Sequence, residues 1–173
     1  DALVGAHPFL APATWSGPDR VRVAHNLQEQ LALVFRGISF RTQSGGVSPD
    51  DSVKVQWTDG PRAVDVLAFG ARYEWSVPRH GLDRRGGRTA WHDAFGSVKL
   101  VYAERNYSDF AVQTALDLLV RRCGAAFAGQ MPSVALWRRG GLAGQTVLLP
   151  ELGEVSVGAT IANTLEHMSP VRA

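Results

Sequence analysis

Two short segments of alternating apolar and polar residues constrain the fold most. Residues 38–42 read Ile-Ser-Phe-Arg-Thr, and residues 53–57 read Val-Lys-Val-Gln-Trp. A period of two is typical of a strand that buries one face. The loop between them, residues 44–50, contains two consecutive glycines, so the pair predicts an antiparallel hairpin. With 18 Gly and 9 Pro in the chain, many turns are expected, which favours a mixed fold over a helical bundle.

Helical periodicity flanks the hairpin on both sides. Before it, Ala24, Leu27 and Leu31 recur at helical spacing until Gly37, and Asp19 or Ser16 can cap the helix. After it, the turn at residues 58–61 opens a short helix with Pro61 in its first position and an inner face containing Val64, Leu67 and Phe69. The clearest helix follows Ser108 as its cap and ends before Gly124. Its expected buried residues are Phe110, Ala111, Ala115, Leu118, Leu119 and Cys123.

Further strands are expected at residues 71–77, 98–102, 134–137, 146–149 and 154–157. Residues 158–168 fit either a terminal helix or an extended tail. This order of elements predicts an α+β fold, with a mostly antiparallel sheet and helices packed on one face.

The length of 173 residues fits one domain, or a domain with a small appendage. We expect an irregular N-terminal arm over residues 1–18, an α+β core over residues 19–127, and C-terminal strands and a tail over residues 128–173, packed on the same core. No apolar run approaches the ~20 residues that span a bilayer, so no membrane role is expected. The start lacks the features of a secretory signal and Cys123 is the only cysteine, so a cytoplasmic location in the host cell is expected.

The cationic residues are almost all arginine. The formal net charge is only +2, yet Lys54 and Lys99 are the only lysines among 18 Lys and Arg residues. An arginine side chain offers a planar fork of donors that pairs with phosphate and stacks on flat rings. The bias is compatible with nucleic-acid contact, and equally with a GC-rich coding sequence.

Two arginine clusters are candidate binding sites for nucleic acid or another anion. The first lies in residues 78–88, where Arg79, Arg84, Arg85 and Arg88 accompany three glycines and a single acid, which predicts a mobile basic loop. The second is Arg138 and Arg139 with the glycines that follow them; a plain hairpin turn is the simpler interpretation of that segment.

Aromatic residues near arginines offer a second route to nucleic acid. Tyr73 and Trp75 lie between Arg72 and Arg79, and alternation places both rings on one face of a strand. Exposed rings there could stack bases, whereas a covered face would make them core residues.

Evidence for catalysis is thin. The sequence has no nucleophile elbow, no phosphate-binding Walker loop and no dinucleotide fingerprint. His80, His92 and Asp93 could converge as a metal or acid–base site, or could be solvated loop residues. Cys123 lies on the apolar stripe of its helix, which indicates a core thiol. No metal or other cofactor is predicted.

Three segments together resemble a known family. Residues 35–41 read Phe-Arg-Gly-Ile-Ser-Phe-Arg, residues 51–61 end in Trp-Thr-Asp-Gly-Pro, and residues 105–108 read Arg-Asn-Tyr-Ser. Over about residues 20–125 this pattern resembles the domain associated with large polyvalent proteins of phages and conjugative elements. The resemblance implies an accessory module carried with incoming DNA and suspected of countering host defence. It brings no catalytic residues.

From these observations we expect a non-enzymatic accessory protein of a mobile genetic element, either a phage or a plasmid. It would bind nucleic acid or a host defence complex through its arginine-rich loops. A second copy of the chain, in a homo-oligomer, is a further partner to consider. One alternative is a metal-dependent nuclease or hydrolase that uses His80, His92 and Asp93. Another is a structural or oligomerisation module, which predicts a large apolar patch on the last third of the chain.

Overall fold

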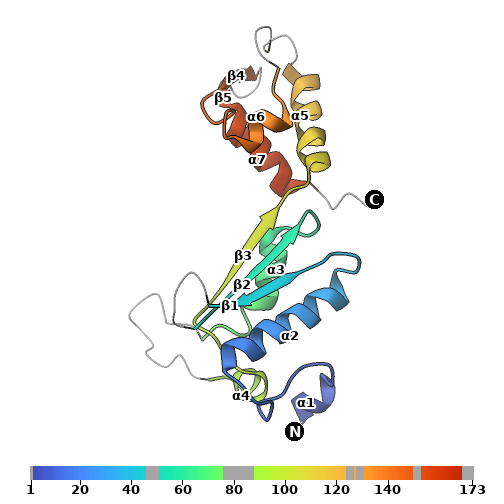
Figure 1. Ribbon diagram of the computed structural model, residues 1–173, viewed down its shortest axis with the longest axis vertical. Helices are drawn as coiled ribbons and strands as arrows, with labels where there is room; N and C mark the ends of the chain where they lie inside the picture. The colour runs from blue at the N-terminus through green and yellow to red at the C-terminus, as the bar shows by residue number, and fades with distance from the viewer. Residues whose placement is uncertain are drawn as a thin grey trace. The chain divides into compact units, whose positions relative to one another are not determined.

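The computed structural model describes residues 2–45, 51–75, 88–123, 127, 131–149 and 153–168. The chain divides into two compact units, Asp1–Asn106 and Tyr107–Ala173, and each has its own hydrophobic core. The α+β fold class is confirmed (Figure 1).

Unit 1 is built on a three-stranded sheet in the order β1-β2-β3. β1 (Arg41–Ser44) pairs with β2 (Ser52–Thr58) in antiparallel orientation, so the predicted antiparallel pairing is confirmed. The first strand begins at Arg41, however, and not at Ile38 as expected. β3 (Leu100–Asn106) pairs with β2 in parallel orientation, so this sheet is mixed and not mostly antiparallel as expected. The parallel pairing follows from topology, because the chain crosses over through α3 before it returns as β3.

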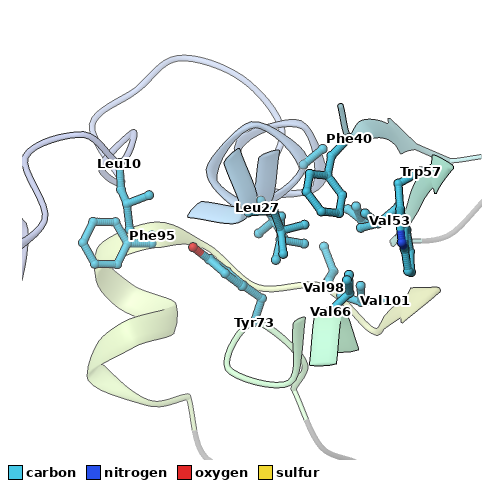
Figure 2. Close-up of a cluster of buried hydrophobic side chains, with 14 of the residues drawn as sticks. Leu10, Leu27, Phe40, Val53, Trp57, Val66, Tyr73, Phe95, Val98 and Val101 are labelled. Carbon is cyan, nitrogen blue, oxygen red and sulfur yellow. The ribbon is translucent and has the colours of Figure 1, made fainter. Parts of the chain in front are cut away.

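The helices of unit 1 pack on one face of this sheet. α2 (Asp19–Val34) contacts β1 and β2, and α3 (Ala63–Gly70) contacts β3; Figure 1 shows the strands in front of α3. The face beneath the helices carries Val53, Val55 and Trp57, all nearly inaccessible. Figure 2 shows Leu27 of α2 in one cluster with Phe40, Val53 and Trp57.

The N-terminal arm, expected to be irregular, contains a short helix, α1 (Ala2–Ala6). Buried Asn26 of α2 holds the arm on the core. Its side-chain oxygen accepts the N–H of Ala11 at 2.7 Å, and its amide donates to the carbonyl oxygens of Ala11 and Phe95 at 3.0 and 3.3 Å. No side chain caps α2 among the described residues, so neither expected cap is used; Asp19 instead forms an ion pair with Arg22.

The expected inner face of α3 is wrong. Val64 and Leu67 are exposed, and Val66 is the buried residue. Gly70 is more than a helix end: a Cβ there would lie 2.8 Å from a Val101 methyl carbon, so its missing side chain lets α3 approach β3 closely. The expected strand at 71–77 is, over its described part, a turn followed by one bridge between Glu74 and Val98.

Unit 2 begins with α5 (Asp109–Cys123), where the predicted helix and cap are confirmed. The Ser108 hydroxyl oxygen accepts the N–H of Ala111 at 3.1 Å. The buried face differs from the expected one, because Phe110 and Leu118 are exposed while Val112 and Leu116 are buried. Cys123 is a buried free thiol, as expected.

The rest of unit 2 packs against α5. Where a strand was expected at residues 134–137, the structure has α6 (Val134–Arg138), capped by Ser133. β4 (Thr146–Leu149) and β5 (Gly153–Ser156) form the expected antiparallel pair, and α7 (Val157–His167) settles residues 158–168 as a helix.

The expected domain boundary at residue 127 is therefore displaced to Asn106, at the end of β3. Among the described C-terminal residues, Leu142, Ile161 and Leu165 pack with α5 residues in a cluster of their own. None of the described helices combines the length and hydrophobicity that crossing a membrane requires.

Candidate nucleic-acid interface

The predicted arginine loops are only partly described. Arg79, Arg84 and Arg85 lie outside the described residues, as does His80. Arg88 is exposed and forms an ion pair with Asp93, at 3.1 Å between Nε and Oδ1.

The second predicted patch is also largely compensated. Arg138 Nη2 lies 2.7 Å from Asp109 Oδ1 and donates to the carbonyl oxygen of Tyr107 at 2.7 Å. Arg139 is exposed, and within the described part of the chain its side chain has no polar partner. Exposed ion pairs contribute only ~0–1 kcal/mol and can be exchanged, but these pairs neutralise two of the predicted charges.

His92 has a structural role in α4 (Ala90–Phe95). It is buried, and its Nδ1 accepts the Thr89 N–H at 3.2 Å while the Thr89 hydroxyl oxygen accepts the His92 N–H at 3.3 Å. This reciprocal capping box starts the helix. Asp93 forms an ion pair with Arg88 instead. The hydrolase hypothesis uses His92 and Asp93 together, but these two described residues have separate partners.

Of the two alternatives left open for Tyr73 and Trp75, the structure excludes a shared stacking face. Tyr73 is fully buried in the core, where desolvation raises the pKa of its phenol. Trp75 is partly exposed and its indole N–H donates to Asp51 at 3.4 Å. Arg72 lies over the Trp91 ring, 5.0 Å from its centroid.

The structure instead presents an open face on the β1-β2-β3 sheet, opposite α2 and α3. Because successive residues of a strand point to opposite faces, the residues that alternate with the buried ones define it. In the register, Arg41 lies opposite Gln56 and Lys54 lies beside Tyr102. We call the following residues the open face: Arg41, Gln43, Lys54, Gln56, Thr58, Leu100, Tyr102, Glu104 and Asn106. All of them are exposed or half-buried.

The centre of the open face is polar and partly neutralised. Lys54 forms an ion pair with Glu104 across β2 and β3, and the Gln56 amide donates to the same carboxylate at 3.2 Å. The hydrogen bond from Lys54, followed by that from Gln56, lowers the pKa of Glu104. Arg41 has no polar side-chain partner within the described ranges, so its guanidinium is the uncompensated cation of this face.

A groove of about 480 Å³ lies at one end of the open face. Its lining residues come from the segment before β1 and from the ends of β2 and β3: Gly37, Ile38, Ser39, Arg41, Gln56, Trp57, Thr58 and Asn106. None of the lining residues is a carboxylate, and the side chains offer a guanidinium, hydroxyls and amides.

The Trp-Thr-Asp-Gly-Pro turn stands beside this groove. Asp59 and Gly60 both have positive φ, at 57° and 68°. Arg105 donates to the carbonyl oxygen of Gly60 at 2.8 Å, and the Trp57 indole N–H donates to that of Pro61 at 3.0 Å. Ile38 packs over Gly60 so closely that a Cβ there would lie 2.8 Å from Ile38 Cδ1. The turn therefore builds and fixes the groove end of the sheet.

Sequence reasoning missed the open face although the signal was present. The alternation that predicted the hairpin also assigned Lys54, Gln56 and Arg41 to the face away from the core. Tyr102 could not be added, because its alignment with Lys54 depends on the parallel pairing of β3.

Unit 2 has a second groove, and it is apolar. It holds about 460 Å³ and lies by α6 and α7, lined mainly by Trp137, Leu142, Ala143, Ala159 and Ala162. This is the described feature closest to the apolar patch that the oligomerisation hypothesis predicts.

Comparisons add no relative: no family model, no curated protein and no solved structure matches this chain. The described residues also contain no group of three or more His, Cys, Asp or Glu side chains placed to hold a metal ion. Functional inference therefore depends on the geometry of this chain.

Proposed function

We propose that this chain is a binding protein for single-stranded nucleic acid and that the open face of the β1-β2-β3 sheet is its interface. The observation that carries the proposal is the alignment of a tyrosine and two cations on a sheet face that the described helices leave uncovered: Tyr102 beside Lys54, with Arg41 on the neighbouring strand. That the protein belongs to a phage or a plasmid remains a prediction, and it rests on the family resemblance alone.

The shape of this face suits unstacked bases. Strands lie about 4.8 Å apart, so side chains on adjacent strands can contact successive parts of one extended chain. Single-stranded nucleic acid is bound by aromatic rings that stack bases and by cations that follow the backbone. Tyr102 is half-buried and supplies the ring, while amides of Gln43 and Gln56 can form hydrogen bonds to exposed base edges.

The electrostatics favour modest affinity. Arg41 and Lys54 contribute two positive charges and Glu104 removes one, so the face has a net charge of about +1. Phosphate contacts make affinity dependent on salt, so we expect a shallow salt dependence rather than the steep one of a highly basic surface.

The test is binding of fluorescein-labelled single-stranded DNA and RNA, measured by anisotropy at about 50 and 200 mM salt. Tyr102→Ala should weaken binding about fivefold or more, since stacking of one base contributes roughly 1–3 kcal/mol, whereas Tyr102→Phe keeps the ring and should bind normally. Lys54→Gln should weaken binding, with Arg20→Gln on α2 as the matched charge control.

A double variant separates this interface from the predicted basic loop. If Arg84→Gln with Arg85→Gln abolishes binding while Lys54→Gln and Tyr102→Ala have no effect, the loop carries the activity and the open-face proposal is wrong. Absence of binding to every strand at low salt would remove the nucleic-acid function itself.

A further inference from the structure

We infer that the groove at the end of the open face is a binding site for a phosphomonoester, a group that a strand terminus or a free nucleotide can supply. The inference goes beyond strand binding, because the groove can hold such a group whether or not bases stack on Tyr102. Nothing in the family resemblance assigns this site.

The donor set matches a phosphate. Arg41 supplies a guanidinium that has no polar side-chain partner within the described ranges, and this group can form two parallel hydrogen bonds to phosphate oxygens. Ser39 and Thr58, both exposed, add hydroxyls from two different segments that line the groove. Each of these groups can donate to oxygen, and none of the described residues that line the groove is a carboxylate that would repel an anion.

The amides complete the set without competing for Arg41. Asn106 ends β3 and its exposed side chain lines the groove. Gln56 already donates one N–H to Glu104, but a primary amide has a second N–H to offer. Glu104 itself is engaged by Lys54 and does not line the groove.

A monoester fits this groove better than an internal diester. A diester linkage carries one negative charge and two non-bridging oxygens, whereas a monoester carries about −1.5 to −2 charges at pH 7 and three acceptor oxygens. Donors from three separate segments, the approach to β1, the end of β2 and the end of β3, can address three oxygens at once. Arg41, Thr58 and Asn106 lie in strands, which hold donors more firmly than a loop does.

The walls of the groove are held in place by contacts of their own. Arg105 anchors the turn after β2 through the carbonyl oxygens of Asp59 and Gly60, and the N–H of Asp59 donates to the carbonyl oxygen of Asn106 at 2.8 Å. Ile38, which also lines the groove, packs against Gly60 of this turn. The site is thus formed before a ligand arrives, which lowers the entropic cost of binding.

The experiment uses the full chain and three small probes: inorganic phosphate, thymidine 5′-monophosphate and thymidine, each titrated while backbone amide NMR signals are recorded. Phosphate and the monophosphate should shift the signals of Ser39, Arg41, Thr58 and Asn106, and thymidine should not. Arg41→Gln should weaken binding of the monophosphate about tenfold or more, while Arg20→Gln leaves it unchanged. Affinity should fall below about pH 6, as the monoester loses its second charge.

A second arm separates the two sources of the phosphate. Oligothymidylates of about ten nucleotides with a 5′-phosphate, a 3′-phosphate or neither are compared on the wild type and on Arg41→Gln. A strand-end site predicts that one phosphorylated form binds more tightly and loses that advantage in the variant; a free-nucleotide site predicts equal binding of all three.

The outcomes distinguish this inference from the proposed function. If strands bind and depend on Tyr102, but neither phosphate nor the monophosphate shifts the groove signals, the phosphomonoester site is wrong and strand binding stands. If the monophosphate binds in the groove and no strand binds, the phosphomonoester site is supported and the proposed strand binding is wrong. Shifts that persist unchanged in Arg41→Gln would also overturn the assignment.

Discussion

At the scale of single residues, the Lys54–Glu104 pair sets the charge of the open face. The carboxylate holds the ammonium group in place and at the same time opposes any incoming phosphate. Glu104 is therefore the residue of the open face that most weakens its binding of phosphate groups.

Glu104→Gln should strengthen strand binding severalfold, because it removes a negative charge and releases Lys54. Glu29→Gln on α2 removes the same charge from another part of unit 1 and is the control. Anisotropy titrations at low salt measure both. Unchanged or weaker binding by Glu104→Gln, with Glu29→Gln normal, would count against phosphates approaching this face.

Acidification should change the affinity for single strands in the same direction as Glu104→Gln does. The pKa of Glu104 is lowered in the folded chain, so the stabilising contribution of the pair is complete above the ordinary pKa of glutamate and is lost as pH falls through the lowered value. Over that acid range the open face becomes more positive, and strand binding should increase. In Glu104→Gln the increase should be smaller, which a pH series of anisotropy titrations can measure.

Gly70 is a second residue with a definite expectation. Gly70→Ala places a Cβ against Val101 and should destabilise the chain by roughly 1–3 kcal/mol through overpacking between α3 and β3. Gly5→Ala in α1 meets no atom within 4 Å and should have little effect. Denaturant unfolding followed by circular dichroism compares the two. Equal stability of both variants would show that α3 does not approach β3 this closely.

At the scale of elements, the sequence predicted those whose pattern is local and long enough. The hairpin alternates over five residues in each strand, and α5 has both a cap and many periodic residues, so both are confirmed. α6 was mistaken for a strand because four apolar residues after Ser133 fit either structure, and the Ser133 cap decides it. The buried faces of α3 and α5 were misjudged because short apolar helices have apolar residues on several sides.

The candidate site was less predictable than the elements. Arginine-rich segments were selected because charge is visible in composition, but Arg88 forms an ion pair with the nearby Asp93 and Arg138 with Asp109, and the sequence shows neither pairing. The open face depends on a parallel pairing over more than forty residues of chain, and no local pattern contains that pairing.

The capping box of α4 gives a prediction at this scale. Thr89→Ala should cost about 1 kcal/mol of stability, because the first N–H groups of α4 lose their acceptor. Ser16→Ala, at a position that caps nothing in the structure's described part, should be neutral. Thermal unfolding of the two variants measures the difference. If Ser16→Ala lowered the stability and Thr89→Ala did not, the assignment of Thr89 as a cap and of Ser16 as a residue without that role would be wrong.

At the scale of the whole molecule, the chain is two units with separate cores. The open face and its groove belong entirely to unit 1. Unit 2 carries the apolar groove by α6 and α7, and nothing in the structure assigns it to strand binding.

A fragment of residues 1–106 should therefore fold alone and bind single strands with the affinity of the full chain. Its core contains both strands of the hairpin, β3 and the helices α2 and α3 that pack on them, and every buried residue of this cluster precedes Asn106. Dispersed amide NMR signals and an anisotropy titration test folding and binding in turn. A folded fragment that no longer binds would assign the interface partly to unit 2.

The most direct test of the account is to map strand binding on the intact chain. Titration of an oligothymidylate of about ten nucleotides into isotope-labelled protein should shift the amide signals of β1, β2 and β3, strongest around Lys54 and Tyr102, and leave those of α5 and α7 in place. Shifts confined to residues 76–87 or to unit 2, with the signals of the three strands unmoved, would contradict it.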